Sequence, residues 1–593
     1  MNGSRLFVSS LRGVIALAAC AALLAPACGG EDRSTLSADG GRDGGGISGE
    51  GGPSSGCLRC SADLHDVLNC NDELVKHCPD DQACHPDGRC VSPCESAKAN
   101  RSTIGCDYWS VDPGTDGEAD GSCFAAFVAN TWTSPVSLTV TYDGKTLDLA
   151  GLARIPSGKG GAITYSPLPG GKLPPGEIAI LFLADFPSPV PLPTRCPAGV
   201  IAGYTQALAS SIETAYLKAF HITSSAPVVA YDIFPYGGAQ SYISSATLLV
   251  PSSAWDTNYI AVDAFQAGGA SGGLAQPFIQ IAAAEDDTKV TLNPAVPIAG
   301  NGSDIAAAPQ GQPVVYTLAA GQVLQLKQDS ELNGTAIESD KPIGVWGGNS
   351  CMNIMVGDTA CDSGHQQLFP VKALGHEYVA ARHRNRKTTE ESPPWRILGA
   401  VDGTKLTYEP VMPQGAPVTI NSGEIRQFNA PGPFVVKSQD KDHPFYVSGH
   451  MTGQSSQGAD FGTGDPEFVN VIPPEQFLRS YVFMTDPTMS NTNLVIVRKK
   501  GQDGAFHAVS LDCAGDLGGF QPVGTAGDYE LARYDLVLNG AENGLCGNGR
   551  HEIHSEAPFG LTVWGWDITV SYAYPAGASV LPINTVVVPT KPK

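Results

Sequence analysis

The amino-acid sequence predicts an all-β protein, and three observations support that prediction. The first is composition, because 69 glycines and 45 prolines in 593 residues favour short strands joined by turns over long helices. The second is the pattern of apolar residues along the chain. From residue 106 onward, short apolar or alternating runs such as VSLTVTYDG and WRILGAVDGTKLTYEP are bounded by turn residues, and helical periodicity over three turns is missing.

The third observation is a phrase that recurs four times. Each copy places a polar, proline-containing hinge between two apolar runs: HITSSAPVVAYDI (221–233), AIESDKPIGVWGG (336–348), PFVVKSQDKDHPFYVSG (433–449) and EIHSEAPFGLTVWG (552–565). The hinge prolines Pro227, Pro342, Pro444 and Pro558 stand 115, 102 and 114 residues apart. We therefore expect four pseudo-repeats of about 110 residues, in a propeller-like ring or as tandem β-sandwiches.

The N-terminus predicts an export signal over residues 1–28. Arg5 and Arg12 precede a short apolar core that ends in small residues and then breaks into GGEDRSTLSADGG. Cys28 after Ala-Pro-Ala, or alternatively Cys20 after Leu-Ala-Ala, resembles the cysteine of a bacterial lipobox, which carries a lipid after cleavage. Cys28 leaves the longer apolar core, and a plain secretory signal is the alternative to both.

The next two segments are expected to be a tether and a small disulfide-rich module. Residues 29–56 are rich in Gly and Ser and contain almost nothing to bury, which is typical of a flexible tether. Residues 57–105 then hold seven cysteines within 38 residues: Cys57, Cys60, Cys70, Cys78, Cys84, Cys90 and Cys94. An exported chain favours disulfides. Because seven is odd, at least one is expected to pair with Cys106, Cys123 or Cys196. Zinc on Cys57 and Cys60 with His65, His77 or His85 is the alternative.

Residues 106–593 form the predicted β-repeat region. After each hinge comes a loop and then an apolar step with Pro and Tyr, as in LLVPSSAWDTNYIAV, LFPVKALGHEYVAA and VIPPEQFLRSYVFM. The last copy of that step, ASVLPINTVVVP, is truncated. A ring would therefore close by placing Phe124–Val128 beside Val580–Val588.

The second hinge and the loop after it resemble the N-terminal domain of IgGFc-binding proteins. Asp340-Lys341-Pro342, Cys351, Cys361-Asp362, His365, Gln367-Leu368, Pro370, Gly375 and Tyr378 follow the order of that family's motif. The departures are Ser363-Gly364, inserted before His365, and Phe369 in place of a proline. The resemblance covers roughly residues 106–590 and implies an exported β-protein. Antibody binding is not carried over from it.

Two further disulfides are expected. Cys351 and Cys361 bound a ten-residue loop, and Cys513 and Cys546 lie together in the last unit. Each pair is therefore expected to pin its loop.

Several clusters invite a chemical interpretation. Asp362, His365 and His376 suggest an envelope hydrolase, but their spacing is not that of HExxH, and a structural polar cluster is favoured. The basic run ARHRNRK (381–387) suggests an anion site or a solvated loop. Carboxylates in 112–121 and 458–467 suggest calcium without the spacing of an EF-hand. Tryptophans at unit ends suggest either a binding surface or core: Trp132, Trp255, Trp346, Trp395, Trp564 and Trp566.

The sequence thus indicates a binding or adhesion lipoprotein of the cell envelope that recognises an extracellular protein or glycan through loops on a β-scaffold. A net charge of −23 argues against nucleic acid as a partner. No enzymatic activity, cofactor or metal is expected. The envelope hydrolase and a purely structural envelope protein are the alternatives.

Overall fold

Strands form nearly all of the secondary structure, so the predicted all-β class is confirmed. The structure is a computed structural model, and it describes residues 58–61, 63–69, 71, 73–113, 119–188, 194–208, 213–265, 276–354, 361–454 and 463–590. The chain divides at Ser55 into two units, and the second unit is described below. The signal segment 1–28, both lipidation candidates Cys20 and Cys28, and the tether 29–56 lie outside the described residues.

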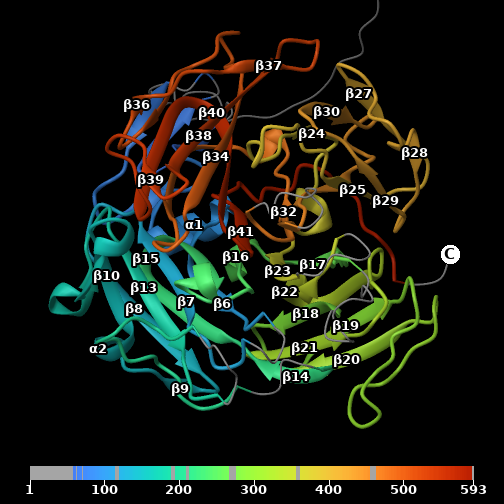
Figure 1. The fold of residues 1–593 in the computed structure, drawn as a ribbon, viewed down its shortest axis with the longest axis horizontal. Helices are drawn as coiled ribbons and strands as arrows, with labels where there is room; N and C mark the ends of the chain where they lie inside the picture. Colours follow the sequence, from blue (N-terminus) through green and yellow to red (C-terminus); the bar gives the residue numbers. More distant parts are fainter. Residues whose placement is uncertain are drawn as a thin grey trace, which may run out of the picture. The chain divides into compact units, whose positions relative to one another are not determined.

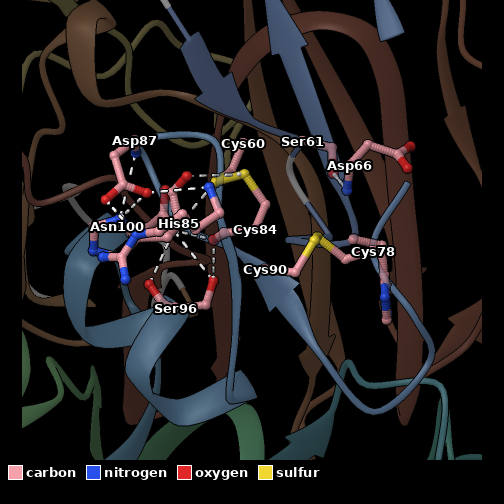
Figure 2. The surroundings of a disulfide bond; sticks show 12 residues. Cys60, Ser61, Asp66, Cys78, Cys84, His85, Asp87, Cys90, Ser96 and Asn100 are labelled. Carbon is pink, nitrogen blue, oxygen red and sulfur yellow. Dashed lines mark hydrogen bonds and ion pairs between the residues drawn. A yellow bond between two sulfur atoms is a disulfide. The ribbon is translucent and has the colours of Figure 1, made fainter. Parts of the chain in front are cut away.

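In the described residues of the disulfide-rich module, the strands form two small sheets beside one helix. Its elements are β1 (Leu58–Cys60), β2 (Asp66–Asn69), β3 (Leu74–His77), β4 (Ala83–Cys84), β5 (Cys90–Val91) and α1 (Pro93–Asn100). Figure 2 shows the Cys60–Cys84 and Cys78–Cys90 bonds beside α1, where the Asn100 amide donates to the Cys84 carbonyl at 3.2 Å. Covalent links replace the apolar core that this short segment lacks.

Four groups of strands follow (Figure 1). The first sheet contains β6 (Ile104–Ser110), β7 (Phe124–Asn130), β8 (Val136–Tyr142), β9 (Lys145–Thr146), β10 (Ala153–Ser157), β11 (Thr164–Pro167), β12 (Lys172–Leu173), β13 (Ile178–Ala184), β15 (Phe220–Phe234) and β16 (Ser245–Leu248), with the short helix α2 (Leu149–Leu152). The second contains β14 (Ala215–Lys218), β17 (Asp256–Ile260), β18 (Pro277–Ala283), β19 (Thr288–Asn293), β20 (Val314–Leu318), β21 (Gln322–Lys327), β22 (Ala336–Met352) and β23 (Asp362–Gln367).

The third group consists of three small sheets and the fourth of one large sheet. The third contains β24 (Glu377–Ala380), β25 (Pro394–Gly399), β26 (Thr404–Lys405), β27 (Thr407–Glu409), β28 (Thr419–Ile420), β29 (Ile425–Asn429), β30 (Phe434–Lys437), β31 (Phe445–Met451) and β32 (Glu467–Asn470). The fourth contains β33 (Leu478–Met484), β34 (Asn491–Lys499), β35 (Val509–Leu511), β36 (Gly515–Asp516), β37 (Gln521–Val523), β38 (Tyr529–Leu538), β39 (Ala541–Glu542), β40 (Arg550–Asp567) and β41 (Val570–Pro575).

Three of the four recurring phrases are single long strands, which corrects the expectation of two strands joined by a hinge. The phrases lie on β15, β22 and β40, whereas the third phrase is split into β30 and β31 by the turn at Asp440–His443. The first half of β15 pairs with β8 and the second half with β7, and the pairing with β6 shifts register between Thr223 and Val228. A proline is tolerated there because a bulge releases it from the ladder of hydrogen bonds.

Each group contributes one short strand to a common contact region. β16 contacts β23 and β41, and β32 contacts the same two strands, so the four strands contact one another in succession (Figure 1). Their residues are fully buried.

The segment after β41, residues 576–590, crosses three of the groups and is called the C-terminal strap below. The Val580 amide donates to the Arg101 carbonyl at 2.8 Å, the Ile583 amide to the Lys372 carbonyl, and the Val588 amide to the Asn258 side chain. Val580 belongs to the large core of the first sheet, which also contains Phe124 and Val128. Val588 instead packs in the core of the second sheet, because the strap continues past the first.

Disulfides connect further parts of the described chain. Cys94 joins Cys106 and thereby links α1 to β6, which agrees with the expectation from the odd cysteine count. Cys123 joins Cys196, Cys351 joins Cys361, and Cys513 joins Cys546. Cys57 and Cys70 lie outside the described residues. Among the helices described, none has the length and apolar character needed to cross a membrane.

Candidate functional site

The hydrolase candidates Asp362, His365 and His376 do not form one site. Asp362 and His365 lie on β23 and are almost completely buried. His376 lies on the segment before β24, where its Nδ1 is 3.3 Å from Glu475 Oε1 and a third of the side chain is exposed. The histidine nearest Asp362 in the chain is therefore enclosed by protein, and the other one pairs elsewhere.

Asp362 is a structural link between groups of strands. Its Oδ2 accepts a hydrogen bond from the Ser571 amide of β41 at 2.6 Å, and its Oδ1 accepts one from the Ser244 amide, just before β16. Burial raises the pKa of Asp362 well above its usual range, and Asp465 and Glu467 add to the effect. These contacts connect three of the strands in the common contact region.

His365 is neutral and also structural. Burial lowers the pKa of His365 to about 3, and its Nε2 lies 3.2 Å from Gln280 Oε1. Its Nδ1 is 4.0 Å from Asp232 Oδ1, and burial raises the pKa of Asp232 to about 8. A general base needs to reach its substrate, and these groups are closed off from solvent.

The basic run 381–387 is neither a solvated loop nor an open anion site. Arg384 donates to Asp535 at 2.8 Å and to Asn491, so it joins the third group of strands to the fourth. The Arg386 side chain is fully buried against Glu391 at 2.8 Å. Desolvation lowers the pKa of the buried His383 to about 3. These cations are used in contacts within the protein.

The metal candidates fit poorly in the described residues. Cys60, a zinc candidate, is bonded to Cys84. The segments 112–121 and 458–467 lie partly outside the described residues. The described chain brings together one group with metal-ligand spacing, Asp512, Cys513 and His551, but Cys513 is bonded to Cys546 and has no thiolate to offer.

The tryptophans at the unit ends are core residues. All six of those named above are at most 4% exposed. They therefore supply apolar area to the cores and no exposed ring for a ligand.

A cleft of about 460 Å³ lies where the disulfide-rich module meets the first and fourth sheets. Most of its lining comes from Ser61, Asp63, Leu64 and Asp66 of the module, from the end of β7 and the middle of β15, and from the strands β33 and β40. We call this the junction cleft. The Cys94–Cys106 disulfide fastens the module that forms one wall of it.

The junction cleft has an apolar floor and a polar rim. The floor consists of buried side chains, among them Leu64, Trp132, Val229, Tyr481 and Val482. The rim carries charged and hydroxyl groups from both walls: Asp63, Asp66, Arg479, Ser480, Glu552 and His554. Concave sites of this size, with a few convergent polar groups on an apolar base, are the usual form of ligand sites in proteins.

Two of the recurring phrases meet at this cleft. Pro227 of the first phrase and His554 and Ser555 of the fourth line it. No sequence motif marks the cleft, because its residues come from eight separate stretches of the chain, spread from Ser61 to Ala576. Recurrence of the phrase was the one available signal, and it indicated architecture only.

Comparison with known proteins finds one matching family model and a human protein of similar sequence. A family model described as "IgGFc binding protein" matches residues 245–565. The human protein named IgGFc-binding protein is 24% identical over 358 residues, which is 58% of this chain and 6% of that protein. The chain thus spans a small part of the length of that relative. No solved structure gives a significant match.

Proposed function

Because the chain belongs to the IgGFc-binding protein family, we propose that it is a binding protein that recognises an extracellular protein or glycan. The observation that carries this proposal is the junction cleft, whose apolar floor and charged rim provide a site for a ligand. Loops at the ends of the sheets extend the available surface.

We do not propose the hydrolase. Asp362 and His365 are buried and used in structural contacts, and the junction cleft is lined by other residues. A purely structural protein would have no need of a cleft with a charged rim, so binding is preferred to that alternative as well.

The proposed location is the cell envelope. The segment 1–28 would direct export, a lipid on Cys28 (alternatively Cys20) would hold the chain in the membrane, and residues 29–56 would separate the folded part from the lipid. Residues 57–105 would form the neck and residues 106–593 the binding region. Labelled-palmitate incorporation in Cys28→Ser and Cys20→Ser variants identifies the lipidated residue.

The proposed arrangement of residues 106–593 is propeller-like. The successive contacts of β16, β23, β32 and β41, and the hydrogen bonds of the C-terminal strap to Arg101 and Thr103, support closure of four units. Closure brings the first and last units together, and the junction cleft lies at that seam.

The test is a binding screen with the full-length protein against envelope and host proteins, IgG Fc and a glycan array. We expect a ligand whose binding is lost in Ser480→Tyr, because the added ring fills the cleft. Ser392→Tyr, at an exposed position on the third group of strands, should bind normally. Binding that survives in both variants would exclude the junction cleft as the site.

A further inference from the structure

We propose that the junction cleft holds an extended, basic segment of a partner protein. This inference rests on the proposed binding function and names the ligand class of the same site. It is based on the open edge of one strand, on the charges of the rim, and on the position of the aromatic rings.

The strand with the open edge is β33. It pairs with β40 in antiparallel register, with Tyr481 opposite Ile553 and Val482 opposite Glu552. The Thr485 amide donates to the Gly549 carbonyl at 3.0 Å, which fixes the phase of the ladder. Since hydrogen-bonded pairs alternate along antiparallel strands, Tyr481 and Phe483 bond to β40. Ser480, Val482 and Met484 therefore direct their peptide groups to the other edge.

Tyrosine hydroxyls occupy two of these three outward positions. Tyr231 donates to the Val482 carbonyl at 3.0 Å, and Tyr574 donates to the Met484 carbonyl. These contacts confirm the phase independently. At the third position the neighbour is the junction cleft, because Ser480 is exposed and lines it. The N–H and C=O of Ser480 thus face the cleft as a donor and acceptor pair.

An extended peptide is the ligand that matches such a pair. A strand laid beside an open edge offers one C=O and one N–H at the spacing of the ladder. The neighbouring floor residues Leu64 and Val229 are apolar, so they suit an alternate side chain of the added segment.

The charges of the rim favour a basic segment. Carboxylates of Asp63, Asp66 and Glu552 face a single arginine, Arg479, among the residues that line the cleft. His77 pairs with Asp66, and Arg550 pairs with Glu552. Asp63 is exposed and accepts from the Ser61 hydroxyl and the His65 amide, both neutral donors. A lysine or arginine of the ligand would complement Asp63, and the net charge of −23 would attract it.

The aromatic rings of the cleft argue against a glycan. Sugars bind to exposed ring faces, but Trp132 and Tyr481 are 4% and 3% exposed. The Trp132 ring stacks on His65 with centroids 4.2 Å apart, and Tyr481 packs against Phe559. Neither ring offers a face to a ligand. A polypeptide is therefore favoured over a glycan.

The probe is a fluorescent nine-residue peptide of alternating valine and lysine, titrated with the full-length protein at physiological salt. The matched probes are the same peptide with glutamate for lysine, and the lysine peptide N-methylated on alternate amides. We expect the lysine peptide to bind at least about tenfold more tightly than either, because each control removes one of the two recognition elements.

Variants locate the contact. Ser480→Pro removes the outward N–H without touching the bonds to β40, and should weaken the lysine peptide about tenfold. Ser480→Ala keeps the peptide group and should bind as the unmodified protein does. Asp63→Asn should weaken binding severalfold, whereas Glu556→Gln, at an exposed site on the same strand β40 but outside the cleft, should not.

Two results would overturn the inference. One is equal affinity for the lysine, glutamate and N-methylated peptides; the other is lysine-peptide binding that is unchanged in both Ser480→Pro and Asp63→Asn. A glycan ligand lost in Ser480→Pro would also refute it, while leaving the proposed binding function in place. Absence of any peptide, protein or glycan ligand would remove both.

Discussion

In each recurring phrase, the carbonyl of the residue after the proline accepts a hydrogen bond from a buried tyrosine hydroxyl. Tyr108 donates to the Val228 carbonyl at 2.6 Å, Tyr259 to Ile343 at 2.9 Å, Tyr378 to Phe445 at 2.6 Å, and Tyr481 to Phe559. In three of them the hydroxyl also accepts the amide three residues before it. Proline lacks an amide hydrogen and disturbs the ladder there, so the hydroxyl satisfies a carbonyl that would otherwise be buried alone.

Removing one such hydroxyl should destabilise the protein. Tyr378→Phe leaves the Phe445 carbonyl and the Gly375 amide without their partner in a buried site, at an expected cost of about 1–3 kcal/mol. The measurement is the urea-unfolding midpoint. Tyr242→Phe is the control, since Tyr242 is half exposed, and its midpoint should not change. Equal midpoints for the Tyr378 variant and the unmodified protein would refute this role.

A buried carboxyl should make stability depend on pH. Asp232 accepts from the Ser110 hydroxyl at 2.7 Å, and burial raises its pKa to about 8. Between pH 4 and 8 the folded protein keeps a proton that the unfolded chain releases. The contribution of Asp232 to stability is therefore present below pH 4 and is lost as pH rises to 8, by roughly 1.4 kcal/mol per pH unit.

Asp232→Asn removes that titration. We compare the stability of the variant with that of the unmodified protein at pH 5 and at pH 8, from urea midpoints. The difference should favour the variant more at pH 8 than at pH 5. A difference between the two proteins that is the same at pH 5 and pH 8 would show that Asp232 does not titrate in this range.

At the scale of the elements, close backbone packing explains the two glycines, Gly347 and Gly348, that follow Trp346 in the second recurring phrase. A Cβ on Gly347 of β22 would lie 1.6 Å from the Val262 carbonyl oxygen, and one on Gly348 would lie 2.1 Å from the Gly364 oxygen. The backbone of β22 thus passes against two neighbouring segments, where a side chain has no room. The close approach of these backbones therefore accounts for the two final glycines of GVWGG.

Gly347→Ala should therefore displace backbone. We expect a loss of about 3 kcal/mol or failure to accumulate as folded protein, measured by urea unfolding and soluble yield. Gly518→Ala serves as the control, because a Cβ there meets nothing within 4 Å. A Gly347 variant as stable as the control would mean that β22 can move away from Val262.

The strands themselves were predictable in type and less so in extent. Alternating apolar runs predict β8 and β19, because a half-buried strand shows its period of two in the sequence. The largely apolar run of β25 fits a strand that is buried on both faces. For each of the long strands β15, β22 and β40 the sequence predicts two strands, since proline and charged residues normally end a strand. Pairing with different partners on either side of a bulge carries the strand through, and that is a tertiary effect.

At the scale of the whole molecule, the C-terminal strap joins parts that are distant in sequence. The Asn584 side chain donates to the Val371 and Leu374 carbonyls at 2.8 and 2.9 Å. Asn258 exchanges two hydrogen bonds with Val588. Side-chain amides thus replace a strand ladder along this irregular segment.

Asn584→Ala should loosen the strap. The Leu374 carbonyl and the Val586 amide lose their side-chain partner, and the Val371 carbonyl keeps only the Leu374 amide as a donor. The urea midpoint should therefore fall by the equivalent of about 1–3 kcal/mol, and limited proteolysis should cut the strap first. Asn429→Ala, which removes one exposed hydrogen bond, is the matched control. The expectation fails if the two variants unfold and are cut alike.

The sequence by itself determined the β class, the disulfide-rich segment, the recurrence of the proline phrase and the family. Each of these depends on composition or on the spacing of residues within a short stretch of chain. Tertiary structure alone decided that Asp362 and His365 are structural, that the basic run 381–387 is used internally, and that a cleft lies between the first and last sheets. The physical reason is separation along the chain. Burial and charge pairing depend on neighbours that lie hundreds of residues away, and local patterns carry no record of them.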